Sequence, residues 1–198
     1  MRASYVRSDL ASLPMPPVSL ETILTRPSPV PAAPGLYGWY FREVPPNVPT
    51  DGCETFGGLT LLYVGISPRR MPEGRKSGQH LRSRIRYHYR GNAEGSTLRL
   101  TLGCLLADRL GLELRRVGSG KRMTLTPKGE AKLSAWMAEN AFVTWIEHPE
   151  PWQLEAELIA SVPLPLNLDQ NAHHEFHGAL TALRREAKQR ARELPIYS

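Results

Sequence analysis

Three short stretches of the chain are almost wholly apolar and rich in β-branched and aromatic residues, which is the pattern of buried strands. Between them, apolar residues recur every three or four positions, the spacing of amphipathic helices. The predicted strands are residues 34–41, which open on a Pro-Gly turn, 59–66 and 142–146. This order predicts an α/β (α+β) domain with a small three-stranded, mainly antiparallel sheet flanked by helices.

Capping signals place the boundaries of the predicted helices. Ser96 and Thr126 are good N-caps, Pro127 and Pro151 suit the first turn of a helix, and Gly111 suits a helix end. A Gly-Ser-Gly turn joins the two short strands of a further predicted hairpin. The predicted helices are 81–90, 96–110, 126–140, 151–159 and 172–193, and the hairpin is 112–125.

Proline content divides the chain further. The first 34 residues hold seven prolines, which lack a backbone donor, so an irregular arm with one helical turn near Leu20 is expected. Residues 42–58 are rich in Pro and Gly and are predicted to be a loop between the first two strands. The predicted organisation is a Pro-rich arm (1–33), a main domain (34–170) with a hairpin-plus-helix insertion at about 91–140, and a basic C-terminal helix (171–198) packed on the domain.

Charge indicates an anionic partner for this domain. The net charge is +6 and the sequence pI is about 9.6, which favours nucleic acid first and an acidic membrane surface second. No apolar run approaches the roughly 18 residues of a spanning helix, and the N-terminus lacks an apolar signal core, so we expect no membrane attachment or secretion. Cys53 and Cys104 are not in CxxC spacing, so we expect free thiols and a cytoplasmic location.

The predicted helix 81–90 carries candidate residues for chemistry at negative charge. Leu81, Ile85 and His88 fall on one face. Arg84 lies four residues before His88, so these two side chains project together. A fixed cation beside a titratable imidazole is useful wherever negative charge builds up. A solvated basic helix is the alternative interpretation.

Positive charge is concentrated around this helix. Between positions 69 and 90 there are eight basic residues and one acidic residue, Glu73. This density exceeds what solubility requires and fits the neutralisation of phosphates, with a solvated loop as the alternative. Apart from Arg84, we predict that these residues contact nucleic acid: Arg69, Arg70, Arg75, Lys76, Arg82, Arg86 and Arg90.

Five short motifs follow one another along the predicted elements. They are Gly35-Leu36-Tyr37, Tyr63-Val64-Gly65, Leu81-x-x-Arg84-Ile85-x-x-His88, Leu154-Glu155-x-x-Leu158-Ile159 and Pro165-x-Asn167. Each tripeptide alone is common, whereas five motifs in order on the matching elements are specific. In this order, and with twelve residues from Glu155 to Asn167, the chain resembles the GIY-YIG nuclease superfamily over roughly residues 34–170.

This resemblance implies a compact endonuclease domain with a three-stranded antiparallel sheet and one divalent metal ion, Mg²⁺ or Mn²⁺, in each site. It implies that Glu155 holds the metal. The resemblance also implies catalytic roles for Tyr37, Tyr63, Arg84, His88 and Asn167.

These residue types suit phosphodiester hydrolysis. A hard cation held by a carboxylate and waters stabilises the leaving oxygen, and the planar guanidinium of Arg84 can pair with non-bridging oxygens. Tyr37 can act as the base for the attacking water if neighbouring cations lower its hydroxyl pKa from about 10. We favour a tyrosine as the base, with His88 or Tyr63 as groups that share the proton.

Some features leave alternatives open. Glu157 is as eligible as Glu155 by residue type, and only the Leu-Glu-x-x-Leu-Ile register selects Glu155. Ile66 stands where the family often has a lysine, so that role is lost or moved to Lys76. The loop between the first two strands is longer than usual for the family and must leave the sheet intact. The insertion either contacts DNA or stabilises the domain, with these basic residues as candidate contacts: Arg115, Arg116, Lys121 and Arg122.

Together these features predict a metal-dependent endonuclease that hydrolyses phosphodiester bonds in DNA, with RNA as an alternative substrate. A non-catalytic nucleic-acid-binding module of the same fold is the second interpretation. A basic scaffold that binds a protein partner through its C-terminal helix is the third. One active site per chain predicts nicking by a monomer, whereas cutting both strands needs a homodimer or two events.

Overall fold

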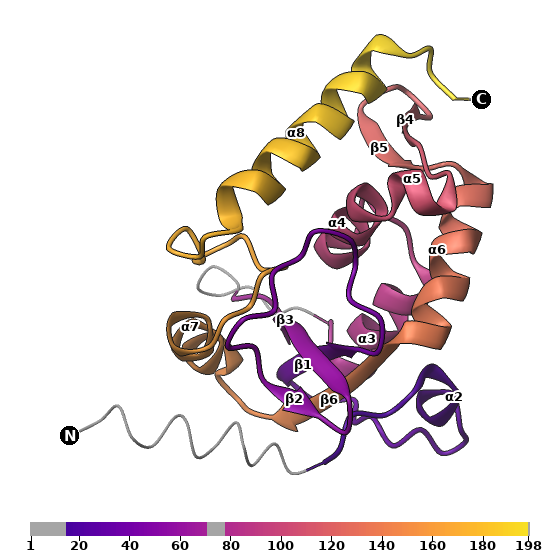
Figure 1. Ribbon diagram of the computed structural model, residues 1–198. Helices are drawn as coiled ribbons and strands as arrows, with labels where there is room; N and C mark the ends of the chain where they lie inside the picture. The colour runs from indigo at the N-terminus through magenta and orange to yellow at the C-terminus, as the bar shows by residue number, and fades with distance from the viewer. Residues whose placement is uncertain (1–14, 71–77, 198) are drawn as a thin grey trace.

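The computed structural model describes residues 15–70 and 78–197 (Figure 1). Its centre is a four-stranded antiparallel sheet with the strand order β2-β3-β1-β6. The predicted α/β class, with an antiparallel sheet flanked by helices, is confirmed. The strands are β1 (Gly35–Phe41), β2 (Thr55–Phe56), β3 (Leu59–Ser67) and β6 (Ala141–Glu147).

Helices surround this sheet and a separate hairpin of two strands, β4 (Leu114–Val117) and β5 (Arg122–Leu125). None of the helices in the described residues is long and apolar enough to cross a membrane. The helices are α2 (Leu20–Ile23), α3 (Leu81–Arg90), α4 (Thr97–Leu105), α5 (Ala107–Leu110), α6 (Pro127–Asn140), α7 (Pro151–Ser161) and α8 (His177–Glu193).

The sheet has one strand more than the sequence predicts. β2 lies within the predicted loop 42–58 and pairs with the first two residues of β3. Gly57 and Gly58 join the two strands with φ of 56° and 80°, the left-handed backbone that a tight two-residue hairpin needs. The expectation of three strands is therefore wrong, because a two-residue strand is too short to produce a periodic pattern.

Two predicted helix boundaries also need correction. The expected helix 96–110 is two helices, α4 and α5, which meet at Leu106, and Gly111 ends the second with a left-handed φ of 60°. The expected helix 172–193 begins as α8 only at His177, because the residues before it form turns. The other predicted helices and the hairpin lie close to their expected bounds.

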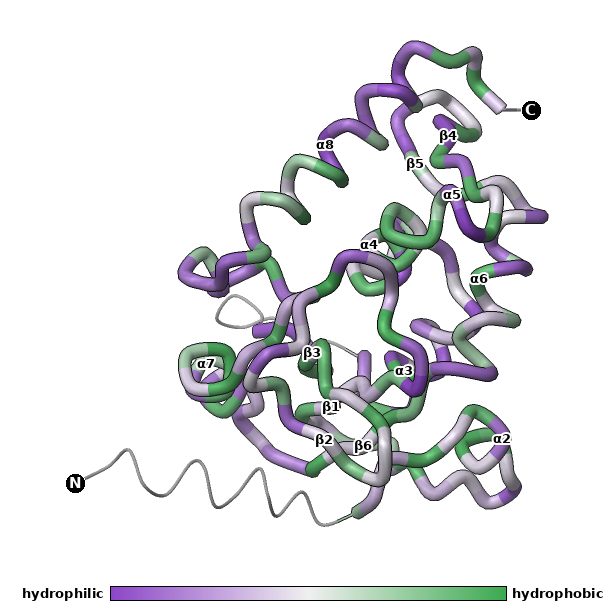
Figure 2. The backbone as a smooth tube through the Cα atoms, in the orientation of Figure 1, coloured by the Kyte–Doolittle hydropathy of each residue, from purple (hydrophilic) through white to green (hydrophobic). Residues whose placement is uncertain are grey.

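The two faces of the sheet carry different helices. Along β1, Trp39 and Phe41 belong to the larger core, together with residues of α3, α4 and α6. Leu36 and Tyr40 belong to the smaller core, together with residues of α7. Every residue of β1 is buried, as expected of a central strand covered on both sides. Figure 2 shows the hydrophobic residues of the sheet and its helices gathered in this region.

The described part of the N-terminal arm packs on the domain. Val18 forms a backbone bridge with Val143 at the outer edge of β6, with N–O distances of 2.9 and 3.0 Å. The carbonyls of Pro31 and Ala33 accept hydrogen bonds from backbone N–H groups in the first turn of α3. These N–H groups have no partner within the helix, so the arm fixes the start of α3.

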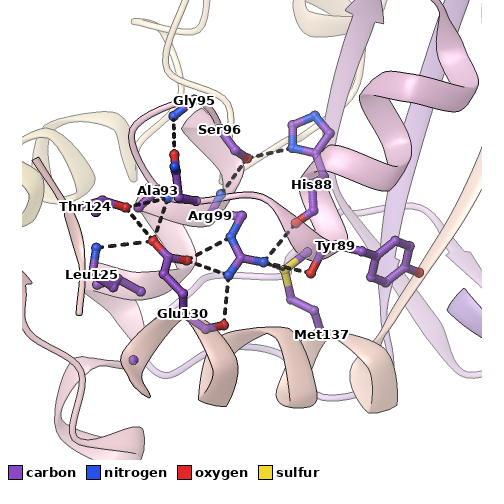
Figure 3. A network of polar contacts seen from close by, with 12 residues as sticks. His88, Tyr89, Ala93, Gly95, Ser96, Arg99, Thr124, Leu125, Glu130 and Met137 are labelled. Carbon is purple, nitrogen blue, oxygen red and sulfur yellow. Dashed lines mark hydrogen bonds and ion pairs between the residues drawn. The ribbon is translucent and has the colours of Figure 1, made fainter. Parts of the chain in front are cut away.

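A buried ion pair connects the predicted insertion to the end of α3 (Figure 3). The side chain of Arg99, on α4, is 0% exposed and lies 2.5 Å from the Glu130 carboxylate on α6. The guanidinium also donates to the carbonyls of His88 and Tyr89, at 3.1 and 2.9 Å. The last carbonyls of a helix lack partners within it, so Arg99 satisfies the C-terminal end of α3.

The carboxylate of Glu130 accepts a second set of hydrogen bonds. Its Oε1 accepts from Ala93 N at 2.8 Å, from Thr124 Oγ1 at 2.6 Å and from Leu125 N at 3.2 Å. One charged pair thus connects the end of α3, the loop that follows it, α4, β5 and α6 (Figure 3). The predicted insertion is therefore part of the packed structure.

We expect Arg99→Met to lower the free energy of unfolding by about 3–5 kcal/mol, because it leaves the largely buried Glu130 carboxylate without its cation. Urea denaturation followed by circular dichroism measures this loss. Arg109→Met is the control, because its ion pair with Glu43 is exposed and such pairs contribute about 0–1 kcal/mol. Equal losses in the two variants would show that the Arg99 pair does not hold these elements together.

Candidate active site

Residues from separate elements line one cavity of about 520 Å³ beside the sheet. Tyr37 comes from β1, Tyr63 from β3, Arg84 from α3 and Glu155 from α7. The segment after α7, residues 167–170, forms a further part of its wall. Side chains far apart in the sequence are thus brought to one place, as the motif order predicts.

The glycines of the first two motifs allow backbones and rings to approach closely. A Cβ at Gly65 would lie 2.7 Å from the Tyr37 hydroxyl oxygen, because the Tyr37 ring lies against the bare backbone of β3. A Cβ at Gly35 would collide with the Ile146 carbonyl oxygen on β6 and would lie 2.7 Å from Leu81 Cδ1 on α3. Glycine at both positions therefore lets Tyr37 and α3 reach the site.

Tyr37 begins a buried chain of hydrogen bonds. Its hydroxyl lies 2.7 Å from His88 Nε2, and His88 Nδ1 lies 2.7 Å from Ser96 Oγ. Ser96 Oγ also accepts a hydrogen bond from Arg99 N as the N-cap of α4. The imidazole is thus held at both nitrogens, and its tautomer decides whether Tyr37 donates to it or accepts from it. Ser96 is predictable as a cap, but no local pattern connects it to His88.

Burial acts on the pKa values of both members of this pair. It raises the pKa of the Tyr37 hydroxyl, and the nearby Arg84 guanidinium offsets only part of that effect. Burial first, and then the charges of Arg84, Arg99 and Arg69, hold the pKa of His88 well below its ordinary value. The condition of a lowered Tyr37 pKa is therefore not met, because desolvation outweighs the effect of the nearby cations.

Tyr63 stands beside the same imidazole and reaches the cavity. Its ring centroid lies 6.4 Å from that of His88, compared with 5.3 Å for Tyr37. Burial raises the pKa of the Tyr63 hydroxyl, and proximity to Tyr37 raises it further. No hydrogen bond joins this hydroxyl to another side chain or backbone group of the described residues, so it is available to water or to a ligand.

Three arginines give the cavity positive charge. Arg69, Arg70 and Arg84 all line it. Arg84 Nη1 donates to the Gly95 carbonyl at 2.9 Å, which fixes the guanidinium while leaving other donors for a ligand. The guanidinium carbon of Arg70 lies 5.9 Å from the centroid of the Trp152 ring, within the range of a cation–π contact.

Two carboxylates face these cations. Glu155 lines the cavity from α7, whereas Glu157 is exposed and lies away from it. Burial raises the pKa of Glu155 to about 7, repulsion from Asp169 adds to this rise, and Arg69 opposes it. Asp169 lines the same cavity. It is missing from the predicted residues because no motif or spacing in the sequence marks it.

A family model described as the GIY-YIG catalytic domain matches residues 35–186, which is most of the chain. The chain belongs to the GIY-YIG nuclease superfamily. Neither the comparison with curated proteins nor the comparison with solved structures found a match. GIY-YIG domains are usually nucleases, so nuclease-type function and a nucleic acid substrate follow from the family. The matched residues continue into α8, and the predicted domain bounds stay predictions.

GIY-YIG nucleases generally depend on a divalent metal ion, and the carboxylates of this cavity fit one. Glu155 and Asp169 offer the oxygen ligands that Mg²⁺ and Mn²⁺ prefer. Burial is the main cause of the raised Glu155 pKa, and the repulsion between the two carboxylates that adds to it is relieved by a bound cation. In the described residues, no group of three or more His, Cys, Asp or Glu side chains is placed so that it could hold a metal ion. Water and substrate therefore have to supply most of the remaining ligands, as is usual for Mg²⁺.

In this GIY-YIG chain, both polar atoms of the Asn167 side-chain amide form hydrogen bonds with β3. Its Oδ1 accepts from Val64 N and its Nδ2 donates to Val64 O, each at 2.9 Å. Leu166 N also donates to Leu62 O at 3.0 Å. The segment formed by Leu166 and Asn167 therefore lies along the edge of β3 much as another strand would. This geometry gives Asn167 a positioning role for the segment that carries Asp169.

Within the described residues, the predicted nucleic-acid contacts have different surroundings. Arg69 and Arg70 line the active-site cavity. Arg82 Nε instead donates to the Val30 carbonyl at 2.7 Å and anchors the arm. Arg86 and Arg90 line a separate hollow beside α2. Two further predicted contacts lie outside the described residues: Arg75 and Lys76.

We expect Glu155→Gln to stabilise the metal-free protein at about pH 8 by on the order of 2 kcal/mol. A raised carboxyl pKa means that the folded state binds the proton more tightly than the unfolded chain. The wild type therefore loses stability as the pH rises from 4.5 to about 7 and above. Urea denaturation at a series of pH values, in the presence of a chelator, measures the difference.

The control for this variant is Glu157→Gln, which changes an exposed glutamate on the same helix. We expect it to leave the stability unchanged across the pH range. A gain in Glu155→Gln that does not grow with pH, or an equal gain in the control, would contradict the burial of Glu155.

Asn167→Asp keeps the shape of the side chain but turns the Nδ2 donor into a carboxylate oxygen that faces the Val64 carbonyl. We expect a loss of about 2–4 kcal/mol at neutral pH, because a donor is lost and two acceptors are brought together. Protonation of the new carboxyl restores a donor, so the loss should shrink as the pH falls. Urea denaturation at neutral and acidic pH tests this, and a loss that does not vary with pH would contradict the hydrogen bonds to Val64.

Proposed function

We propose that the protein is a divalent-metal-dependent endonuclease that hydrolyses phosphodiester bonds in DNA by attack of water. The observation that supports this is the convergence on one cavity of Tyr37 from β1, Arg84 from α3 and Glu155 from α7, with His88 of α3 hydrogen-bonded to Tyr37 behind it. Binding alone requires the cations but gives no reason for a half-buried carboxylate, with a pKa raised to about 7, beside them.

The arginines of the cavity bind and orient the scissile phosphate. Arg84 is held by the Gly95 carbonyl, so its guanidinium is in place before the substrate arrives. Its remaining N–H groups can pair with non-bridging phosphate oxygens in the planar geometry that arginine offers. Donors fixed in advance stabilise charge in the transition state without a cost of reorganisation.

Tyr37 is the group placed to receive the proton of the attacking water, because its hydroxyl lies between the cavity and His88. In the tautomer in which Tyr37 donates to Nε2, the Tyr37 oxygen takes the water proton as its own proton moves to His88. His88 Nδ1–H then donates to Ser96 Oγ. The negative charge of a bound phosphate favours the imidazolium that forms, which burial disfavours in its absence.

Glu155 and Asp169 would hold the metal ion, which supplies Lewis-acid stabilisation of the charge on the leaving oxygen. The ionised form of Glu155 is the one that binds a cation. Because its pKa is raised to about 7, the carboxylate becomes fully available as a ligand on the alkaline side of neutrality. Tyr63, whose hydroxyl is available at the cavity, can contact the water or the phosphate.

We further propose a cytoplasmic location, and action as a monomer for nicking or as a homodimer for cutting both strands. Cys53 and Cys104 form no disulfide, which agrees with a reducing compartment. The single candidate site found in the described residues supports nicking by one chain.

We expect the wild type to nick supercoiled plasmid DNA with Mg²⁺ or Mn²⁺ and to be inactive with EDTA. Arg84→Ala and Glu155→Ala should each lower the cleavage rate by at least about 100-fold, because each removes a group that stabilises transition-state charge. Gel electrophoresis separates the nicked and linear products. Glu157→Ala, on the exposed side of the same helix, is the control and should cleave at the wild-type rate.

Absence of metal-dependent nicking by the wild type on duplex, single-stranded and branched DNA would reject the proposal. If binding that weakens with salt remained in that case, the chain would be a nucleic-acid-binding module of this fold. Cleavage of RNA alone would keep the nuclease and change its substrate.

A further inference from the structure

The active-site cavity continues beyond the catalytic residues. A second hollow of about 410 Å³ adjoins it, and the two share Thr97, Leu168 and Asp169 in their walls. One side of α8 forms the rest of the second hollow, which we call the α8 groove. This side of α8 carries four cations that have no assigned role in the site: Arg184, Arg185, Lys188 and Arg192.

The spacing of residues along α8 explains why these cations line one groove. The four basic residues and Thr181 recur at intervals of three or four positions, which places them on one face of the helix. Another face holds α8 on the protein, since Leu180 and Ala191 are buried and Leu183 and Ala187 pack against the larger core. The helix is therefore fixed by its apolar side, with the basic side turned toward the groove. Figure 2 shows hydrophilic and hydrophobic segments alternating along it.

The charges of α8 are segregated around its axis. Glu186 and Glu193 lie on a different side from the groove cations by helical spacing. Glu193 and Arg190 line another hollow, between α8 and the α4–α5 region. The side of α8 that carries these two residues therefore faces away from the α8 groove. In the part of the chain that the structure describes, no ion pair joins a groove cation to a carboxylate. Asp169 in the groove wall acts on Arg184 through its charge, so four cations face one carboxylate, and their excess of positive charge attracts an anionic ligand.

We propose that the α8 groove binds the phosphate backbone of the nucleic acid on one side of the scissile bond, so that α8 forms part of the substrate-binding surface. The inference rests on the proposed function, because it extends the substrate path from the same site. At 1.5 Å per residue, the groove cations span about 12 Å, which matches roughly three to four phosphates of one strand along a duplex axis.

The position of the groove favours nucleic acid over an acidic protein partner. A phosphate held by Arg84 and Arg69 has neighbours about one nucleotide away, and the shared walls lead from that cavity to Arg184. A continuous polyanion can use both hollows at once. An acidic protein segment gives no reason for the basic groove to be joined to a nuclease cavity.

The test compares two triple variants that remove the same number of charges, each in a Glu155→Gln background so that binding is measured without cleavage. The groove variant carries Arg185→Gln, Lys188→Gln and Arg192→Gln. The control variant carries Arg109→Gln, Lys128→Gln and Arg190→Gln, all at exposed positions outside the groove. Fluorescence anisotropy of a labelled DNA duplex gives the affinity of each protein between about 50 and 200 mM salt.

We expect the slope of log K against log salt to become shallower by about 2–3 in the groove variant, because each lost phosphate contact removes about 0.9 from it. The control variant should change the slope by less than about 1. Equal changes in both triples, or an unchanged slope in the groove variant, would overturn the inference. Displacement of the duplex by polyglutamate as readily as by unlabelled DNA would assign the groove to an acidic protein and would also overturn it.

Single variants guard against misfolding of the triple. Arg185→Gln alone should lower the slope by about 1, and its circular dichroism spectrum should match that of the parent. The binding test of the groove and the cleavage test of the proposed nuclease can fail independently of each other. Plasmid nicking by the wild type with an unchanged slope in the groove variant keeps the nuclease and rejects the groove. No nicking with a shallower slope rejects the nuclease and keeps the groove.

Discussion

The buried guanidinium of Arg99 is the group on which the geometry of the site depends. It satisfies the last carbonyls of α3 and pairs with Glu130, while its own backbone N–H is capped by Ser96. The same Ser96 hydroxyl holds the His88 ring (Figure 3). One cluster therefore sets both the end of the helix and the orientation of the imidazole. A buried charged group is held firmly in place, because removing one of its partners costs several kcal/mol of folding free energy.

The predicted insertion gains a role from this arrangement. It provides Ser96 to His88, the Gly95 carbonyl to Arg84, and Thr97 to the cavity wall. Of the two alternatives for the insertion, stabilisation is thus supported by direct contacts with the site. The short motifs mark the residues that face the substrate, but they do not mark the structure that holds those residues in place.

The sequence predicts those elements whose signal is local. Three of the strands, the boundaries of α3 and the convergence of Tyr37, Tyr63, Arg84 and Glu155 are predictable, because periodicity and motif order are properties of short segments. β2 and the turns before α8 lack a periodic signal. The contact of Ser96 with His88, the placement of Asp169 and the α8 groove depend on tertiary packing. The sign of the Tyr37 pKa shift was also beyond the sequence, since it depends on how far burial outweighs the nearby arginines.

The edges of the central sheet limit how two copies of the chain can meet. Val18 occupies the outer edge of β6 at Val143, and Asn167 takes both backbone groups of Val64 on β3. At the remaining end of the strand order, β2 is two residues long. Strand addition between chains needs a long, open row of backbone groups, which these positions do not offer. A homodimer that cuts both strands would therefore have to be built from side-chain surfaces, with each sheet remaining within its own chain.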